Sequence, residues 1–253
     1  MENQAPSTGG LLRGQAAYEP RTPWTPGLAL LTAVLIVLVS VAGAALLFGL
    51  GKVGIGNWRG ASDEAATMLV LAAGQLVTVL LTLVAAALFG GRLVDVLALR
   101  APAGGVGVYL GAVVLMVLLQ VAVGVLQHVT IAHDMFADLR PFVRLATGPE
   151  WPLALLVVGV GAPLSEELLV RGFLLSALAR SRLGFAAAAV ISTALWAALH
   201  AGYTLVGILE VFIIGLFFSW LVWRTGSVRV AIFCHALYNS LILLALRFVP
   251  LPA

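Results

Sequence analysis

The sequence predicts an all-α protein, a polytopic membrane helix bundle with about seven transmembrane helices. Of its 253 residues, 62% are hydrophobic and only 10% are charged. A soluble domain averages about 25% charged residues, so this chain has too few to cover a surface that faces water. The apolar residues also fall into long runs, and a helix needs about 20 of them to cross a bilayer. The lipid bilayer is therefore the expected surrounding of most of the chain.

Seven apolar runs are the candidate spans. Pro163, in the fourth run, removes a backbone donor and predicts a kink there. The runs cover residues 27–50, 66–90, 105–127, 151–179, 184–200, 204–223 and 228–247.

The segment between the third and fourth runs, residues 128–150, is too polar to span a membrane. Its scattered large apolar residues favour an amphipathic piece at the membrane interface, and an ordinary long loop is the alternative. Pro141 is expected to interrupt any single helix in this segment.

The remaining divisions follow from these runs. The first apolar run is too long and begins too late for a cleaved signal peptide. We expect a disordered cytoplasmic tail at 1–26, N-terminal transmembrane helices and the interfacial segment at 27–150, a functional transmembrane core at 151–247 and a short tail at 248–253.

The basic residues indicate topology rather than nucleic-acid binding. The formal net charge is only +3, and the basic residues are scattered over connecting segments, so no nucleic-acid partner is expected. An N-terminus in the cytoplasm places eight of them inside and five outside, which favours that orientation. All but Lys52 are arginines, and the Ala, Val, Leu and Gly content is high, as is typical of a GC-rich bacterial genome. The expected location is thus a bacterial cytoplasmic membrane.

Three ionisable residues stand inside the fourth apolar run: Glu166, Glu167 and Arg171. Each costs roughly 2.5–3.5 kcal/mol at the centre of a membrane helix, so a helix retains all three only if they are paired or used. Glu167 and Arg171 are four residues apart, which predicts an ion pair on one helix face. Glu166 points about 100° away and is left without a local partner, so it is the candidate general base.

Further polar side chains lie on two later runs: His200 ends the fifth, and His235 and Asn239 lie one turn apart on the seventh. At 1.5 Å of rise per residue, Glu166 lies about 20 Å along its helix from Arg180, which marks the expected cytoplasmic end. His200 and Asn239 lie at about 24 and 15 Å from the same side. These depths overlap within the uncertainty of helix boundaries, so three helices are expected to direct these groups at one buried point.

Other residues receive plainer interpretations. Trp196 and Tyr238 are expected to be wall residues, and Cys234, the single cysteine, a packing residue that forms no intrachain disulfide. Glu210 is expected to be an interfacial or supporting acid rather than a catalytic one.

The order and spacing of these residues resemble those of a known family. The CPBP family comprises CAAX proteases and bacteriocin-processing enzymes, relatives of the Ras-converting CAAX endopeptidase. The similarity covers about residues 151–245, and Trp196 stands where phenylalanine is commoner. It rests on Glu166-Glu167-x-x-x-Arg171, Trp196-x-x-x-His200 and His235-x-x-x-Asn239.

The resemblance implies peptide-bond hydrolysis within the membrane, with a peptide or a membrane protein as substrate. Glu166 and His200 would activate a water, and His235 and Asn239 would stabilise the oxyanion. Glu167 and Arg171 would hold the helix. No cofactor is favoured, because the chain lacks HExxH. Zinc held by Glu166, His200 and His235 remains the alternative.

Two other function classes stay open at this point. A transporter or proton relay would also place Glu, Arg and His inside the membrane. A peptide-binding immunity protein without catalysis is the second. The oligomeric state is not predicted.

Overall fold

The computed structural model describes residues 11–12, 16–52, 62–130 and 136–251. No β-strand occurs among these described residues, and six of their helices are long and apolar enough to cross a membrane. The all-α class and the polytopic bundle are therefore confirmed. The six are α1 (Pro26–Lys52), α2 (Asp63–Phe89), α4 (Gly107–Thr130), a composite helix over Trp151–Arg180, α10 (Leu205–Thr225) and α11 (Val228–Phe248).

The fifth expected span is shorter than predicted. Helix α9 (Gly184–Ala198) has 15 residues, which corresponds to about 22 Å against a hydrocarbon core of about 30 Å. Leu199 and His200, the last two residues of the apolar run, form a turn instead. His200 therefore lies just beyond the end of a helix rather than within one.

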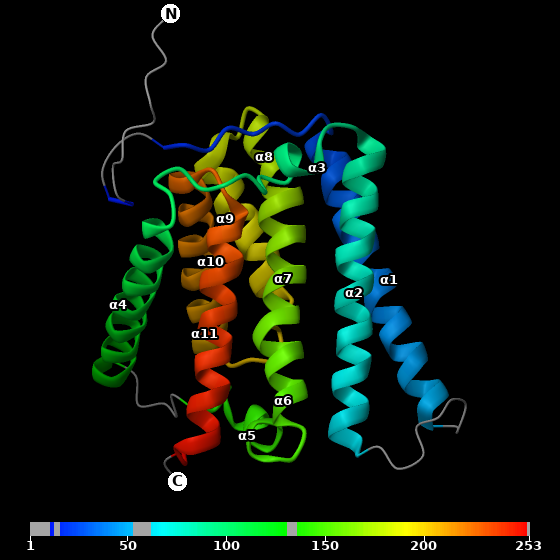
Figure 1. Cartoon of the computed structure of the whole chain (residues 1–253), viewed down its shortest axis with the longest axis vertical. Helices are drawn as coiled ribbons and strands as arrows, with labels where there is room; N and C mark the ends of the chain where they lie inside the picture. The colour runs from blue at the N-terminus through cyan, green and yellow to red at the C-terminus, as the bar shows by residue number, and fades with distance from the viewer. Residues whose placement is uncertain (1–10, 13–15, 53–61, 131–135, 252–253) are drawn as a thin grey trace, which may run out of the picture.

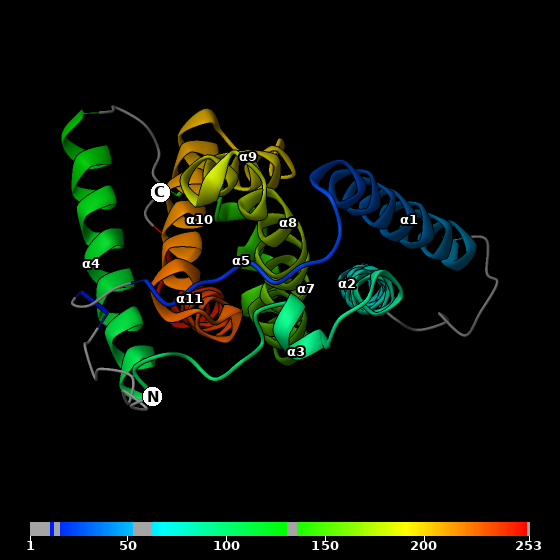
Figure 2. The ribbon, with the colours of Figure 1, turned by 90° about the horizontal axis from the view of Figure 1, so that it is seen from above.

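The composite helix occupies the middle of the molecule (Figures 1 and 2). Helices α1 and α2 pack against each other on one side of it, and α11 packs along its other side. Helix α4 lies outermost, beyond α10 and α11 and away from α1 and α2 (Figure 2). Helix α9 packs between α10 and α8. This arrangement surrounds the composite helix, which carries the three ionisable residues, with other helices.

The composite helix contains two π-helical segments. It consists of α6 (Trp151–Ala154), η1 (Leu155–Gly161), α7 (Ala162–Glu167), η2 (Leu168–Leu174) and α8 (Leu175–Arg180). The Ala162 N–H bonds the Val157 carbonyl five residues earlier, and Pro163 falls in the first turn of α7, where its missing N–H is tolerated. The proline is therefore accommodated by a widened turn within a helix that continues to Arg180. Such turns occur frequently at functional sites.

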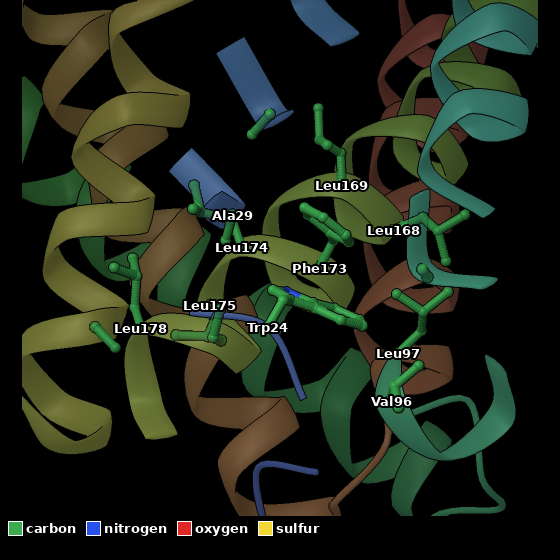
Figure 3. Packing of buried hydrophobic residues seen from close by; sticks show 14 of the residues in the cluster. Trp24, Ala29, Val96, Leu97, Leu168, Leu169, Phe173, Leu174, Leu175 and Leu178 are labelled. Atoms are coloured by element: carbon green, nitrogen blue, oxygen red, sulfur yellow. The ribbon is translucent and has the colours of Figure 1, made fainter. Parts of the chain in front are cut away.

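The segment before α1 crosses one end of the bundle (Figure 1). The backbone N–H of Tyr18 donates to the Trp223 carbonyl at 3.2 Å, and its hydroxyl donates to Ser176 at 2.8 Å. Trp24 stacks on Phe173 with 4.7 Å between ring centroids (Figure 3). These contacts hold residues 16–25, part of the segment expected to be disordered, against the bundle, and Thr22 and Trp24 are buried there. Residues 1–10 and 13–15 lie outside the described chain.

The largest of the neighbouring apolar clusters holds the composite helix in place. Figure 3 shows Trp24, just before α1, and Leu97, just after the short helix α3 (Leu93–Val96), against Phe173 and Leu175 of the composite helix. This packing fixes the half of the composite helix that follows Glu167.

The segment expected to lie at the interface contains a helix, α5 (Arg140–Thr147). Pro141 stands in its first turn, where proline is tolerated, and the helix does not extend before Arg140. Phe142 and Val143 pack against Leu243 and Leu246 of α11. Residues 131–135 lie outside the described chain. The amphipathic interpretation therefore holds for α5.

Candidate active site

A cavity of ≈ 470 Å³ lies beside the composite helix. Glu166, His200, His235 and Asn239 all line it, together with Trp196 and other residues of α2, α4, α10 and α11. We call it the polar cavity. The structure thus brings together the four residues that were expected to meet at one buried point. Glu167 and Arg171, the other two predicted site residues, do not line the polar cavity.

Glu166 has a neutral partner that the sequence did not indicate. The indole Nε1 of Trp196 donates to Glu166 Oε2 at 2.8 Å. Trp196 is therefore more than the wall residue that was predicted, and Glu166 is not without a partner. The bond holds one carboxylate oxygen and leaves Oε1 without a hydrogen bond among the described residues.

Glu167 and Arg171 form the predicted ion pair, and both side chains are 0% exposed. Arg171 Nη1 donates to Glu167 Oε1 at 3.0 Å. His235 Nδ1 lies 3.0 Å from the same oxygen, although His235 was expected to act with Asn239. A carboxylate that is paired with arginine accepts hydrogen bonds, so the His235 Nδ1 carries a proton. Glu167 therefore orients His235 as well as pairing with Arg171.

Arg171 is enclosed on several sides. Its Nη2 donates to the Gly215 carbonyl at 2.9 Å, and its guanidinium lies 4.5 Å from the centroid of the Trp196 ring. A Cβ atom on Gly215 would lie 2.7 Å from Arg171 Nη2 and 2.6 Å from Thr193 Cγ2. Only glycine fits at this position of α10, because the arginine and α9 approach its backbone so closely.

The two histidines present the same ring nitrogen to the polar cavity. His235 stacks on Phe218 with 4.7 Å between centroids, and its Nδ1 is used by Glu167. The Nδ1 of His200 lies 3.1 Å from the Trp196 carbonyl, which can only accept, so this nitrogen also carries a proton. Nε2 is therefore the available nitrogen on both rings, and on a neutral ring it is an acceptor.

Asn239 supports the widened turn of the composite helix. Its Nδ2 donates to the Val158 carbonyl at 3.1 Å. An α-type bond to this carbonyl would come from Ala162, whose N–H goes to Val157, and a π-type bond from Pro163, which has no N–H. Asn239 thus supplies the partner that Pro163 removes. The second N–H of the amide is not used by Val158 and is available to donate to a group in the polar cavity.

The donor set for a metal is not assembled. Within the described ranges, no group of three His, Cys, Asp or Glu side chains lies close enough to hold an ion. In the trio named for zinc, Glu166, His200 and His235, the Nδ1 of His235 contacts Glu167, which leaves its Nε2 free. Zinc binding by this trio therefore stays a prediction.

Sequence reasoning missed several residues of this cavity. Gln120 and Gln127 of α4 and Gln75 of α2 line it, although the first three spans carry no charge at mid-depth. The sequence did contain a signal for these residues. A glutamine in an otherwise apolar span is unusual, because an amide without a hydrogen-bond partner is costly in a membrane. Gly215 gave no signal, since glycine is common in membrane helices.

Fold and site together define the class: a multi-pass helical membrane protein with the Glu166 carboxylate, two imidazoles and an amide on the wall of one cavity. The family model described as type II CAAX prenyl endopeptidase Rce1-like matches residues 148–241 of the chain. This region contains all six predicted site residues, and the resemblance to the CAAX-protease family is confirmed over it. The match supports a membrane protease of the CAAX type. No curated protein and no solved structure shows significant similarity to the chain.

Proposed function

We propose that the protein is an intramembrane endopeptidase in which Glu166 activates a water molecule. The observation that carries this proposal is the gathering of Glu166, His200, His235 and Asn239 on the wall of one cavity. A base within hydrogen-bond reach of a water, and donors at the developing oxyanion, are what amide hydrolysis requires.

In the first step, a water molecule beside Glu166 attacks the carbonyl carbon of the substrate. Glu166 takes one proton of the water, so the carbonyl oxygen becomes an oxyanion and the carboxylate becomes a carboxylic acid. The Trp196 indole holds Oε2, which directs the free Oε1 to the water. The Nε2 of His200 accepts a hydrogen bond from the other O–H of the water and orients it, without taking the proton.

The oxyanion requires donors. Asn239 offers the amide hydrogen that does not go to Val158. His235, which Glu167 orients through Nδ1, donates from Nε2 when its ring is doubly protonated. Glu167 and Arg171 thus act through His235, as positioning residues.

In the second step, the tetrahedral intermediate collapses. The C–N bond breaks, and Glu166 returns its proton to the leaving nitrogen. The products are a carboxylic acid and an amine, and Glu166 is again a carboxylate. The reaction consumes one peptide bond and one water, and every side chain named above ends in the state in which it began.

The membrane setting of the proposal is a bacterial cytoplasmic membrane with the N-terminus inside. Supporting this orientation, the start of α1 and the end of α11 lie at opposite ends of the bundle (Figure 1). Arg180 and Arg224 bond the segment that precedes α1, so they lie near the end at which α1 begins. The substrate is a peptide or a segment of a membrane protein, because the site lies inside a bundle that lipid surrounds.

Chelation separates the glutamate mechanism from the zinc alternative. Purified protein is dialysed exhaustively against a chelator and then assayed for cleavage of a fluorogenic membrane peptide, with and without added zinc. We expect the same rate in all arms, because Glu166 rather than an ion activates the water. Loss of cleavage on chelation with recovery on adding zinc would transfer that role to a metal.

A further inference from the structure

A second polar cluster lines the polar cavity and takes no part in the proposed chemistry. Glu210 stands in the second turn of α10. Gln127 of α4 donates its Nε2 to Glu210 Oε2 at 3.1 Å. Tyr238, on α11, lies near this carboxylate. Three helices thus meet at Glu210, and all three of these side chains face the same cavity as Glu166.

Glu210 has no counter-charge among the residues that the structure describes. In the described ranges, no arginine or lysine lies within ion-pair distance of it, whereas Glu167 is neutralised by Arg171. Amides and phenols supply hydrogen bonds but no positive charge. An acid within a membrane span is costly unless it is paired or used, so the empty position beside Glu210 fits a cationic group.

An unused amide donor lies nearby on α4. The Nε2 of Gln120 is buried and has no hydrogen-bond partner in the described part of the chain. Gln120, Gly124 and Gln127 are spaced four and three residues apart, so they share the face of α4 that lines the cavity. Gln120 and Gln127 are separated by about 10 Å along the helix, the length of roughly three extended residues. An extended peptide running along α4 would therefore reach both.

We propose that Glu210, Gln127 and Gln120 form a subsite for an extended peptide that carries a basic side chain. The lysine or arginine of the peptide pairs with the Glu210 carboxylate, which Gln127 holds in place. A backbone carbonyl of the peptide accepts the free N–H of Gln120. Glu210 is then the residue that makes the protease prefer a basic residue near the scissile bond. This inference rests on the proposed function, and it concerns substrate choice.

The experiment measures binding separately from cleavage. Three apolar peptides are used, acetylated and amidated at their ends, with lysine, norleucine or glutamate at one central position. Their binding to the full chain in detergent is measured by fluorescence anisotropy. All proteins carry Glu166→Gln so that no peptide is consumed. Four proteins are compared: one that keeps Glu210, called the Glu210 protein, and the variants Glu210→Gln, Glu210→Lys and Gln120→Leu.

We expect the lysine peptide to bind the Glu210 protein about 10-fold to 100-fold more tightly than the norleucine peptide, the usual effect of a charged hydrogen bond. Glu210→Gln removes this preference, and Glu210→Lys transfers it to the glutamate peptide. Gln120→Leu weakens the binding of all three peptides by the same factor. A lysine preference that is absent, or that survives Glu210→Gln, overturns the proposal. If Glu210→Lys does not fold, Glu210→Gln decides alone.

Cleavage by the protein with Glu166 restored keeps the two proposals apart. Cleavage without any preference for lysine would leave the protease standing and remove the subsite. Binding that depends on Glu210, with no cleavage of any peptide, would keep the subsite and remove the protease.

Discussion

The indole of Trp196 donates to Glu166 while the face of the same ring lies 4.5 Å from the Arg171 guanidinium. One side chain thus links the candidate base to the buried ion pair behind it. The two contacts use different parts of the ring, the N–H and the π-face, so substitution can separate them.

Trp196→Phe tests the N–H alone. The phenyl ring keeps the packing against Arg171 but cannot donate to Glu166, so the carboxylate loses its fixed orientation. We expect turnover to fall roughly 10-fold, as for the loss of one hydrogen bond to a charged group, with little change in melting temperature. Trp196→Ala, the matched control, should lower the melting temperature as well. Unchanged turnover in Trp196→Phe would show that the indole does not position the base.

Arg171→Ala should destabilise the fold. It leaves Glu167 buried without its cation, at a cost of about 3–5 kcal/mol, which thermal unfolding in detergent measures. The double variant Glu167→Gln/Arg171→Met replaces the pair with neutral side chains and should be nearer to wild type in stability, yet low in activity because His235 loses its carboxylate. Arg21→Ala, at an exposed ion pair, is the control. A wild-type melting temperature for Arg171→Ala would contradict the buried pair.

Asn239 is expected to serve both the helix and the oxyanion, and Pro163→Ala separates these roles. Asn239→Ala leaves the Val158 carbonyl without a partner, at about 1–3 kcal/mol, and should lower turnover roughly 10²–10³-fold. Pro163→Ala supplies a backbone N–H in that turn, so the stability cost of Asn239→Ala should shrink in the double variant. Turnover should stay low. Recovery of turnover together with stability would make Asn239 purely structural.

Gly215→Ala should damage the protein although the substitution adds one methyl group. The added Cβ would lie 2.8 Å from Trp196 Cε3 and closer still to Arg171 and Thr193. Overpacking of this kind costs about 1–3 kcal/mol and would also displace the ring that holds Glu166. Gly43→Ala in α1, where nothing lies within 4 Å, is the matched control. Equal melting temperatures for the two variants would contradict the close approach.

The composition and the cost of buried charge made much of this site predictable. An apolar run that retains Glu166, Glu167 and Arg171 is unusual enough to mark the composite helix as functional. The four-residue spacing then gave the Glu167–Arg171 pair, because side chains at that separation meet on one helix face whatever surrounds them.

Contacts between distant helices could not be predicted. His235 and Glu167 are 68 positions apart, and their bond depends on how α11 packs against the composite helix. The bond from Trp196 to Glu166 likewise depends on the rotation of α9. The length of α9 was overestimated because Leu199 and His200, which end the predicted run, form a turn beyond the helix. Nothing in Leu155–Gly161 distinguishes a π-helical segment from an α-helix by periodicity.

The central claim is that Glu166 is the base that activates water, and Glu166→Gln tests it most directly. Purified wild type, Glu166→Gln and Glu19→Gln, a carboxylate exposed at the surface, are compared for cleavage of one membrane peptide and for melting temperature. Glutamine keeps the shape and can accept the Trp196 bond but cannot take a proton from water. We predict a fall in turnover of roughly 10²–10⁴-fold for Glu166→Gln alone, with all three melting temperatures alike. Undiminished cleavage by folded Glu166→Gln protein would contradict the account.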